Sequence, residues 1–535
     1  MKHFKAVVCL VFLLLSGCER AATPFSQSST KVPTERNPLP SRTVTPVANE
    51  TPEEVGDPLL LDPTQVLTME VEQRQDQLQS YALLPEFSGD LEANQNLTLY
   101  EIEIQVSLDP SHVRASLDGL ARITYTHLDE NPLDDLVLML WPNDQQYNAE
   151  MVTGPVQIDG QWGASYVELG GLVLRIPLSE EITLGEKVQV DVPFTIETQG
   201  SIRDQRKRFG ITNGVLVAPT FYPLIPRLVD GEWQAEIPPV GGDTTNSDVA
   251  FFDVTITAPE EFEIVTSGVE VDRQLEGKDQ QRVRYVTGPM RDFALALGSL
   301  ERIYRVVNGV QLNVWVLPDH IPSGERLANA ATMQMQYLNE IVGPYPYAEL
   351  DILDTPCAFG GIEYPGLIYI CSLAEGYFID TAVHEVAHQW FYGLIGNDQI
   401  REPWLDESAA TYWQALYYEN AVGEDRAAGQ LVQYRSWVSN PEQRNAPIGL
   451  GIGDYPSSGD YYTIVYYKGA VFYDALRDQL GDERFFEFLR TYFERYRYQF
   501  VHSLDFQKTA EEVCDCDLSP FFDLWVYHGG EIPDW

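Results

Sequence analysis

Two histidines and a glutamate occur in the run His384-Glu385-Val386-Ala387-His388. Helical positions four residues apart lie on one face, so both imidazoles could bind a single metal ion. Glu385 would lie near the same face and could take a proton from a water molecule beside the ion. The alternative is a buried helix that contains two hydrogen-bonded histidines. The spacing favours a zinc site with His384 and His388 as ligands and Glu385 as the catalytic base.

A catalytic zinc site also requires a third protein ligand and an open coordination position. Glu407 lies nineteen positions after His388. A helix over 380–395, followed by a second that begins at 403 or 404, could fold back and bring the Glu407 carboxylate to the ion. A glutamate at a helix start more often compensates the helix dipole. Here the spacing favours Glu407 as the third metal ligand.

This pattern resembles that of the gluzincin zinc peptidases of the aminopeptidase N and leukotriene hydrolase type, in which a glutamate ligand follows His-Glu-x-x-His after eighteen residues. The family motif Gly-x-Met-Glu-Asn is similar to Gly360-Gly361-Ile362-Glu363-Tyr364, with Ile for Met and Tyr for Asn. The resemblance implies that Glu363 binds the free α-amino group of the substrate, with Gly360 and Gly361 in the same substrate-binding loop. It also implies one Zn²⁺ per chain.

A second segment, Tyr466-Tyr467-Lys468-Gly469, resembles the Tyr-x-Lys-Gly segment of the same family. The resemblance implies that Tyr466 is catalytic and donates a hydrogen bond to the tetrahedral intermediate, where a phenol would stabilise the developing oxyanion. Tyr461, Tyr462 and Tyr467 are the alternatives if the alignment is shifted.

The resemblance covers about 97–535 and implies two domains, an N-terminal all-β sandwich-like domain and a mainly α thermolysin-like zinc metallopeptidase domain. Family members usually continue into a C-terminal helical domain. We therefore expect a short form without that domain, with a more open cleft.

The residue pattern also indicates this division. Apolar and polar residues alternate from about Thr98, which predicts a β-rich domain over 96–300. The pattern then becomes helical and predicts a catalytic domain over 301–535. The predicted strands are 99–106, 121–125, 172–176, 188–195, 252–256, 282–286, 310–317, 350–353 and 367–370. The predicted helices are 324–342, 380–395, 404–420, 467–480, 483–496 and 503–513.

The N-terminus has the layout of an exported protein. Lys2 and Lys5 precede the apolar run 6–15, which is too short to span a bilayer and predicts a signal peptide over 1–17. Leu-Ser-Gly-Cys at 15–18 resembles the lipobox of bacterial lipoproteins and implies lipidation of Cys18, and hence anchoring to the outer face of a bacterial membrane, at the cell surface or in the periplasm. Ordinary cleavage is the alternative. The segment 18–95 begins with a stretch rich in Thr, Pro and Ser and is predicted to be a tether.

The net charge bears on the kind of partner, and the cysteines bear on possible disulfides. The net charge of −45 disfavours a nucleic-acid partner. In an oxidising compartment Cys357 and Cys371 could form a disulfide. Cys514 and Cys516 would form a strained ring if bridged, and the sequence leaves their state open.

These features predict a zinc aminopeptidase that acts outside the cell on peptides with a free N-terminus. A zinc endopeptidase is the near alternative. A non-catalytic surface-binding lipoprotein that retains the fold is the alternative from another class.

Overall fold

The computed structural model describes residues 78–198, 207–242, 245–355, 360–371, 378–533 and 535. All of these residues belong to one compact unit of the chain. The predicted signal peptide, Cys18 and most of the predicted tether lie outside the described residues. No helix among the described residues has the length and apolar character needed to cross a membrane.

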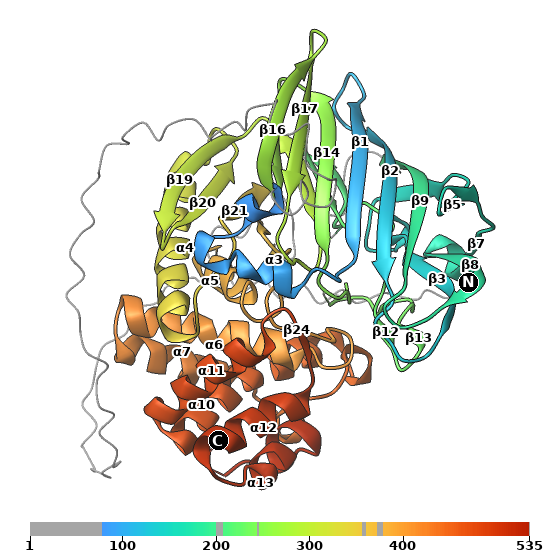
Figure 1. Ribbon diagram of the computed structural model, residues 1–535. Coiled ribbons are helices and arrows are strands. Elements are labelled where there is room, and N and C mark those ends of the chain that lie inside the picture. Colours follow the sequence, from blue (N-terminus) through green and yellow to red (C-terminus); the bar gives the residue numbers. More distant parts are fainter. Residues whose placement is uncertain (1–77, 199–206, 243–244, 356–359, 372–377, 534) are drawn as a thin grey trace, which may run out of the picture. The chain divides into compact units, whose positions relative to one another are not determined.

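The N-terminal part of the described chain is β-rich, as predicted, and is built on one large sheet (Figure 1). Its order is β16 (Val269–Glu276), β17 (Gln280–Val286), β14 (Phe251–Pro259), β1 (Leu99–Leu108), β2 (Ala115–Thr126), β9 (Lys187–Thr198), β5 (Gln157–Ile158) and β6 (Gln161–Trp162), with β4 (Ala149–Thr153) also on β9. In β1 the alternation places Tyr100, Ile102, Ile104 and Val106 in the core. The neighbour of β1 on its other side is β14, which lies about 150 residues later in the sequence and pairs with β1 in parallel.

Two smaller sheets complete the β-rich part. One has the order β3 (Leu133–Met139), β8 (Val173–Ile182) and β7 (Tyr166–Glu168). The other has the order β10 (Gly210–Thr212), β11 (Val215–Pro219), β18 (Ala294–Gly298) and β15 (Glu263–Thr266). A hairpin is formed by β12 (Leu228–Val229) and β13 (Glu232–Trp233).

The C-terminal part begins with a five-stranded sheet and continues as helices. The sheet order is β19 (Glu301–Val307), β20 (Val310–Val316), β21 (Glu349–Thr355), β23 (Leu367–Cys371) and β22 (Gly361–Ile362). The main helices are α4 (Ile321–Ile341), α5 (Phe378–His388), α6 (Trp404–Ala421), α7 (Glu424–Trp437), α10 (Gly469–Leu480), α11 (Asp482–Tyr496) and α12 (Ser503–Cys514). Shorter elements are η1 (Ser80–Ala82), η2 (Pro85–Phe87), α3 (Gly89–Ala93), η3 (Trp141–Asn143), η4 (Leu169–Gly171), β24 (Gly396–Asn397), α8 (Pro441–Asn445), η5 (Ile452–Asp454), α9 (Ser458–Tyr461), η6 (Tyr462–Lys468), β25 (Phe500–Val501), α13 (Ser519–Phe522) and η7 (Asp523–Tyr527). The predicted fold class, a β-rich domain followed by a mainly helical one, is confirmed; the exact domain boundaries stay predictions.

The prediction that the helix of the two histidines reaches residue 395 is wrong, because α5 ends at His388. Tyr392 has a φ of 126°, which no α-helix accommodates. Its carbonyl accepts a hydrogen bond of 3.0 Å from Nε of the buried Arg291, a residue of the β-rich part. A contact between the two parts of the chain therefore stabilises the turn that follows the helix.

The predicted helix over 467–480 also begins differently, because residues 462–468 form the π-helix η6 and α10 starts only at Gly469. Cys514 is joined to Cys516 by a disulfide, with the Cα atoms 5.2 Å apart and Asp515 in the left-handed region between them. Cys371 is disulfide-bonded, and its predicted partner Cys357 lies outside the described residues.

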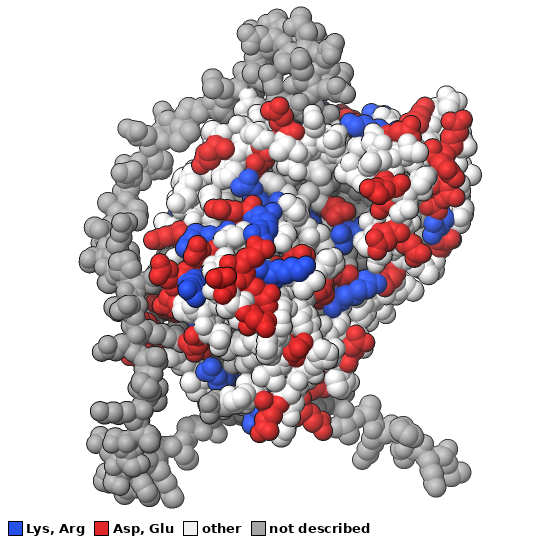
Figure 2. All heavy atoms as spheres, turned by 60° about the horizontal axis from the view of Figure 1, so that its bottom comes forward, with Lys and Arg blue, Asp and Glu red and all other residues white. Residues whose placement is uncertain are grey.

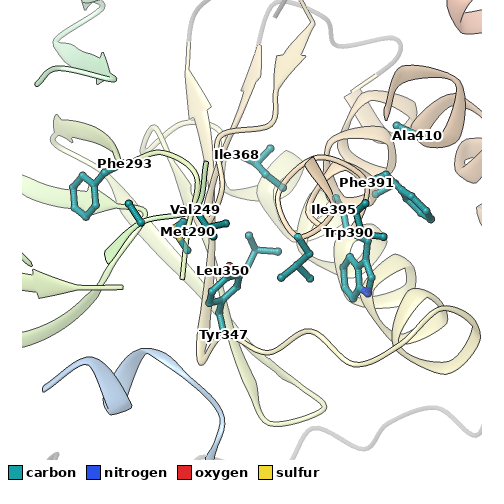
Figure 3. Close-up of a cluster of buried hydrophobic side chains, with 14 of the residues drawn as sticks. Val249, Met290, Phe293, Tyr347, Leu350, Ile368, Trp390, Phe391, Ile395 and Ala410 are labelled. Carbon is teal, nitrogen blue, oxygen red and sulfur yellow. The ribbon is translucent and has the colours of Figure 1, made fainter. Parts of the chain in front are cut away.

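One hydrophobic core runs through both parts of the chain. Figure 3 shows Met290 and Phe293 of the β-rich part in one cluster with Leu350 of the five-stranded sheet and Trp390, which follows α5. Because these residues are buried together, the β-rich part supports the end of α5.

Candidate active site

The helices α5 and α6 place the three predicted metal ligands together. Nε2 of His384 lies 3.1 Å from Oε2 of Glu407, and Nε2 of His388 lies 3.3 Å from the same oxygen. The two Nε2 atoms are 3.0 Å apart. All three side chains are buried. Two imidazoles and one carboxylate are the donor set of many catalytic zinc sites, so these residues fit the ion that the sequence predicts.

Hydrogen bonding orients one of the two imidazoles. Nδ1 of His388 lies 3.1 Å from the carbonyl oxygen of Phe391, to which it can only donate. This bond turns Nε2 toward Glu407, and a hydrogen bond from the other ring nitrogen is how ligand histidines are usually oriented. Nδ1 of His384 is buried and has no hydrogen-bond partner among the described residues.

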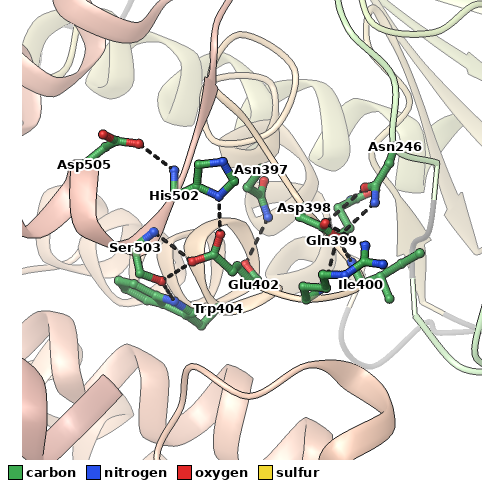
Figure 4. Close-up of polar contacts among 11 residues, drawn as sticks. Asn246, Asn397, Asp398, Gln399, Ile400, Glu402, Trp404, His502, Ser503 and Asp505 are labelled. Carbon is green, nitrogen blue, oxygen red and sulfur yellow. Dashed lines mark hydrogen bonds and ion pairs between the residues drawn. The ribbon is translucent and has the colours of Figure 1, made fainter. Parts of the chain in front are cut away.

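The loop before α6 is fixed by polar contacts that determine where Glu407 lies (Figure 4). The carboxylate of Glu402 accepts hydrogen bonds from Ser503 N at 2.8 Å and Nδ1 of His502 at 2.7 Å. Asp398 accepts a bond of 2.9 Å from Asn246 of the β-rich part. The first turn of α6 is therefore anchored on two sides.

Further carboxylates surround His388. Ligand atoms of Glu363, Glu385 and His388 lie within 4.8 Å of one another, as do those of His384, His388 and Glu407. All five side chains are buried. The predicted base Glu385 and the predicted amino-group ligand Glu363 therefore lie in one cluster with the predicted metal ligands, and His388 belongs to both groups.

The charges in this cluster stabilise one another. Burial opposes a charge on His388, but the carboxylates of Glu363 and Glu407 outweigh it and raise the pKa of His388 well above its usual value. Burial likewise opposes the charge on Glu407, yet the charge of His388 and the contact with His384 lower the pKa of Glu407. Burial lowers the pKa of His384. Burial and the neighbouring Glu407 charge raise the pKa of Asp406 to about 7. The cluster favours positive charge at its centre, which a divalent cation would supply.

The loop that carries Glu363 is held by a core shared between the two parts of the chain. Ile362 and Tyr364, on either side of Glu363, are buried with strands β11 and β18 of the β-rich part. Tyr364, which replaces the family's asparagine, packs edge-on against Tyr369 with the ring centroids 5.2 Å apart. The substitution therefore contributes to packing beneath the loop.

The two glycines of the loop have different roles. Gly360 has a φ of 97°, a conformation that favours glycine. A Cβ added to Gly361 would lie 2.5 Å from Oε1 of Glu385. The missing side chain at Gly361 thus lets Glu385 lie directly against the loop.

Two glutamines that the sequence did not single out connect this loop to residues adjacent in sequence to the predicted metal ligands. Gln389 donates from Nε2 to the carbonyls of Glu363 and Tyr364, at 3.4 and 3.3 Å. Gln399 donates from Nε2 to Oε1 of Glu363 at 3.0 Å and to Oδ2 of Asp406 at 3.2 Å. No local pattern marks a buried glutamine as functional, so only the structure identifies them.

Tyr466 lies on η6 beside the predicted metal ligands. Its hydroxyl donates to Oε1 of Glu407 at 2.5 Å, and its ring stacks on that of His384 with the centroids 5.8 Å apart. Among the alternatives, Tyr467 packs against Trp437, and the hydroxyl of Tyr462 donates to the carbonyl of Gly241. The geometry therefore favours Tyr466 for the predicted role, and π-helical segments are frequent at functional sites.

Close packing between η6 and α6 fixes the position of Tyr466 relative to Glu407. Ser408 Oγ donates to the carbonyl of Val465 at 2.7 Å. A Cβ added to Gly469 would lie 1.9 Å from Ser408 Oγ. The absence of a side chain at Gly469 therefore allows the chain after η6 to pack closely against Ser408, the residue next to Glu407.

The cluster opens into a cavity of about 610 Å³. The cavity is lined by both parts of the chain. Its lining residues are Gln145, Gln146, Lys207, Arg208, Val240, Gly241, Gly242, Gly361, Glu363, His384, Glu385, His388, Glu407, Ser458, Tyr462 and Tyr466.

Comparison with known proteins shows which proteins this chain is similar to. Residues 327–525 match the model of the peptidase family M1 domain. Among curated proteins, the chain is 29% identical to aminopeptidase B of Rattus norvegicus over 227 residues, which is 40% of this chain and 34% of the relative. It is 23% identical to leucine aminopeptidase 2 of Ajellomyces capsulatus over 389 residues, which is 68% of this chain and 60% of the relative. The chain thus spans between about a third and about 60% of the length of these relatives.

Among solved structures, the fold is similar to that of the M1 zinc metallopeptidase of Deinococcus radiodurans. The TM-score is 0.62 at 17% identity, over 82% of this chain and 95% of the other. The Deinococcus protein has also been solved with a Tyr-Ser-Ala substrate bound, and that structure has a TM-score of 0.62 at 18% identity.

Proposed function

We propose, from the match of residues 327–525 to the peptidase family M1 domain, that this chain is a zinc-dependent aminopeptidase that removes N-terminal residues from peptides. One observation carries the proposal. The predicted metal ligands, the predicted base Glu385 and the predicted amino-group ligand Glu363 all surround His388 within one buried cluster. A site that only binds peptides would not require a buried base beside the metal ligands.

We propose that His384, His388 and Glu407 hold the ion. Zinc in such a site polarises a carbonyl and lowers the pKa of water to about 7. Glu385 takes the proton of the attacking water and delivers it to the nitrogen of the leaving amine. Glu385 is held in place for this transfer by its close contact with Gly361.

Glu363 and Tyr466 orient the substrate. The carboxylate of Glu363 would accept hydrogen bonds from the α-ammonium group, which places the first peptide bond at Glu385 and makes the enzyme an exopeptidase. The hydroxyl of Tyr466, now bonded to Glu407, would donate instead to the developing oxyanion.

We also propose that the protein is exported and anchored through Cys18 to the outer face of a bacterial membrane. The support is the sequence at 1–18 and the Thr-, Pro- and Ser-rich segment that follows it. Radiolabelled fatty acid should be incorporated by the full chain and not by Cys18→Ala. Equal labelling of both would contradict the anchor.

Blocking the substrate's amino group separates the aminopeptidase from the endopeptidase alternative. The wild-type protein should cleave a free peptide at least about 100-fold faster, in kcat/KM, than its N-acetylated form. Glu363→Gln should lower kcat/KM for the free peptide by about 10–100-fold, because a hydrogen bond between charged groups is lost. Glu483→Gln, an exposed position on α11, is the matched control. Equal turnover of free and acetylated peptides would instead favour an endopeptidase.

Gln399 should affect substrate binding through Glu363. In Gln399→Leu the bonds to Glu363 and Asp406 are both lost, so KM for a free peptide should rise by about 2–10-fold while zinc affinity is retained. Steady-state kinetics and metal analysis measure the two effects separately. A fall in kcat at constant KM would show that Gln399 does not act through the amino-group ligand.

A further inference from the structure

A buried arginine of the β-rich part, Arg291, contacts the turn that follows α5, and only 1% of this residue is exposed. Figure 2 shows one face of the molecule, on which basic side chains lie at the surface among acidic ones. Burial lowers the pKa of Arg291 to about 10, so the guanidinium stays charged at neutral pH. A buried charge is costly unless hydrogen bonds replace the lost water. The hydrogen-bond partners of Arg291 therefore indicate what this side chain does.

The guanidinium of Arg291 joins three segments that are far apart in the sequence. Nε donates to the carbonyl of Tyr392 at 3.0 Å, in the turn after α5. Nη1 donates to the carbonyl of Ser247 at 3.2 Å, in the β-rich part, and Nη2 to the carbonyl of Gln499 at 2.5 Å, just before β25. All three acceptors are backbone oxygens. The side chain therefore fixes the course of the main chain.

The turn that Arg291 contacts contains a strained residue. Tyr392 has a φ of 126°, which is rare for a residue with a bulky side chain. Such a conformation persists only where the surrounding structure holds it, and it occurs often at functional sites. The main-chain N–H of Gly393 donates to the carbonyl of His388 at 2.8 Å, so the strained residue belongs to a turn that begins at a predicted metal ligand.

One peptide plane connects the strained residue to the imidazole of His388. Nδ1 of His388 lies 3.1 Å from the carbonyl oxygen of Phe391, to which it donates. The Phe391 carbonyl and the Tyr392 N–H belong to the same planar peptide unit. The φ of Tyr392 therefore sets the direction of the Phe391 carbonyl relative to the Tyr392 carbonyl, which Arg291 holds.

We infer that Arg291 is a positioning residue for His388. By holding the Tyr392 carbonyl, it aims the Phe391 carbonyl at Nδ1 of His388, and Nε2 of the same ring then faces Glu407. The β-rich part thus contributes to the metal site without supplying a ligand. This inference rests on the proposed function, because it requires that His388 binds zinc.

Two substitutions test this role without removing the positive charge. A Cβ added to Gly396 would lie 2.2 Å from Cζ of Arg291, so Gly396→Ala should displace the guanidinium. Arg291→Lys retains a cation but replaces the planar group of three nitrogens by one. Both should raise the dissociation constant for Zn²⁺ by about tenfold, the lower end of the effect of losing a ligand's hydrogen-bond partner. Competition with a chromophoric chelator measures it, well below the melting temperature of each variant.

The visible spectrum of the protein loaded with Co²⁺ separates positioning from stability. Both variants should shift the cobalt absorption bands, because these report the coordination geometry of the ion. A purely structural role would lower the melting temperature of the metal-free protein and leave the spectrum and the zinc affinity unchanged. That result in both variants would overturn the inference.

Arg227 offers the matched control, because it also joins the β-rich part to the segment around β25. Its Cζ lies 3.3 Å from the ring centroid of Phe500, and Nε donates to Asp248 at 3.0 Å. Arg227→Met should therefore retain the wild-type zinc affinity, even where its melting temperature falls. An equal loss of affinity in this variant would show that Arg291 has no specific role. Zinc binding that His384→Ala leaves unchanged would contradict the proposed function itself, and the inference with it.

Discussion

Replacement of Glu385 by Gln should lower kcat by about 10²–10⁴-fold, the usual contribution of a general base. Glutamine has nearly the same shape, so it can occupy the buried position against Gly361, but it cannot accept the proton of the attacking water. Metal ligands and substrate contacts stay in place, and KM should change little. Steady-state kinetics on an aminoacyl anilide measure both constants.

Two measurements make this result specific to Glu385. The zinc content and the melting temperature of Glu385→Gln should equal those of the wild type, and the exposed Glu483→Gln should retain full activity. A loss of less than tenfold, with zinc still bound, would show that another group removes the proton.

Removal of the metal should have an effect of similar or greater size. Treatment with a chelator should reduce kcat/KM by about 10³-fold or more, because the ion contributes several kcal/mol to the stabilisation of the transition state. Added Zn²⁺ should restore the activity. Activity that survives complete removal of the metal would refute the zinc mechanism.

A stability measurement tests the same site independently of catalysis. An ion that binds the folded state and not the unfolded state raises the free energy of unfolding. Zinc should therefore raise the melting temperature of the wild type, whereas His384→Ala and Glu407→Gln should lose most of this increase. His528→Ala provides the control, because its side chain is 79% exposed and lies far along the sequence from the ligands. An unchanged zinc effect in the ligand variants would mean that the ion binds elsewhere.

The sequence predicted those parts of the site that depend on local geometry. His384 and His388 lie one helical turn apart on α5, so their spacing alone places both on one face. The alternating pattern of β1 likewise follows from the period of a strand with one buried face. The third ligand required one further assumption, a second helix that folds back onto the first, and α6 has this arrangement.

The end of α5 could not be predicted in this way. Local propensity continues the helix past His388, but the turn is stabilised by Arg291, which is 101 residues from Tyr392 in the sequence. The same applies to the loop before α6, where Asn246 contacts Asp398 across 152 residues. Such contacts exist only once the sheets of the two parts have packed together.

The sequence by itself therefore determined which residues are candidates for the chemistry at the centre of this protein, namely the predicted metal ligands and base, and the family to which they are similar. Only the tertiary structure decided what surrounds that centre: the bond from Gln399 to Glu363, the placement of Tyr466 on a π-helix, and the cavity that both parts of the chain line. The physical reason is the separation in sequence between the residues that fix each feature. Spacing within one helix is set by backbone geometry, whereas a cavity is formed by segments whose proximity depends on the packing of the whole core.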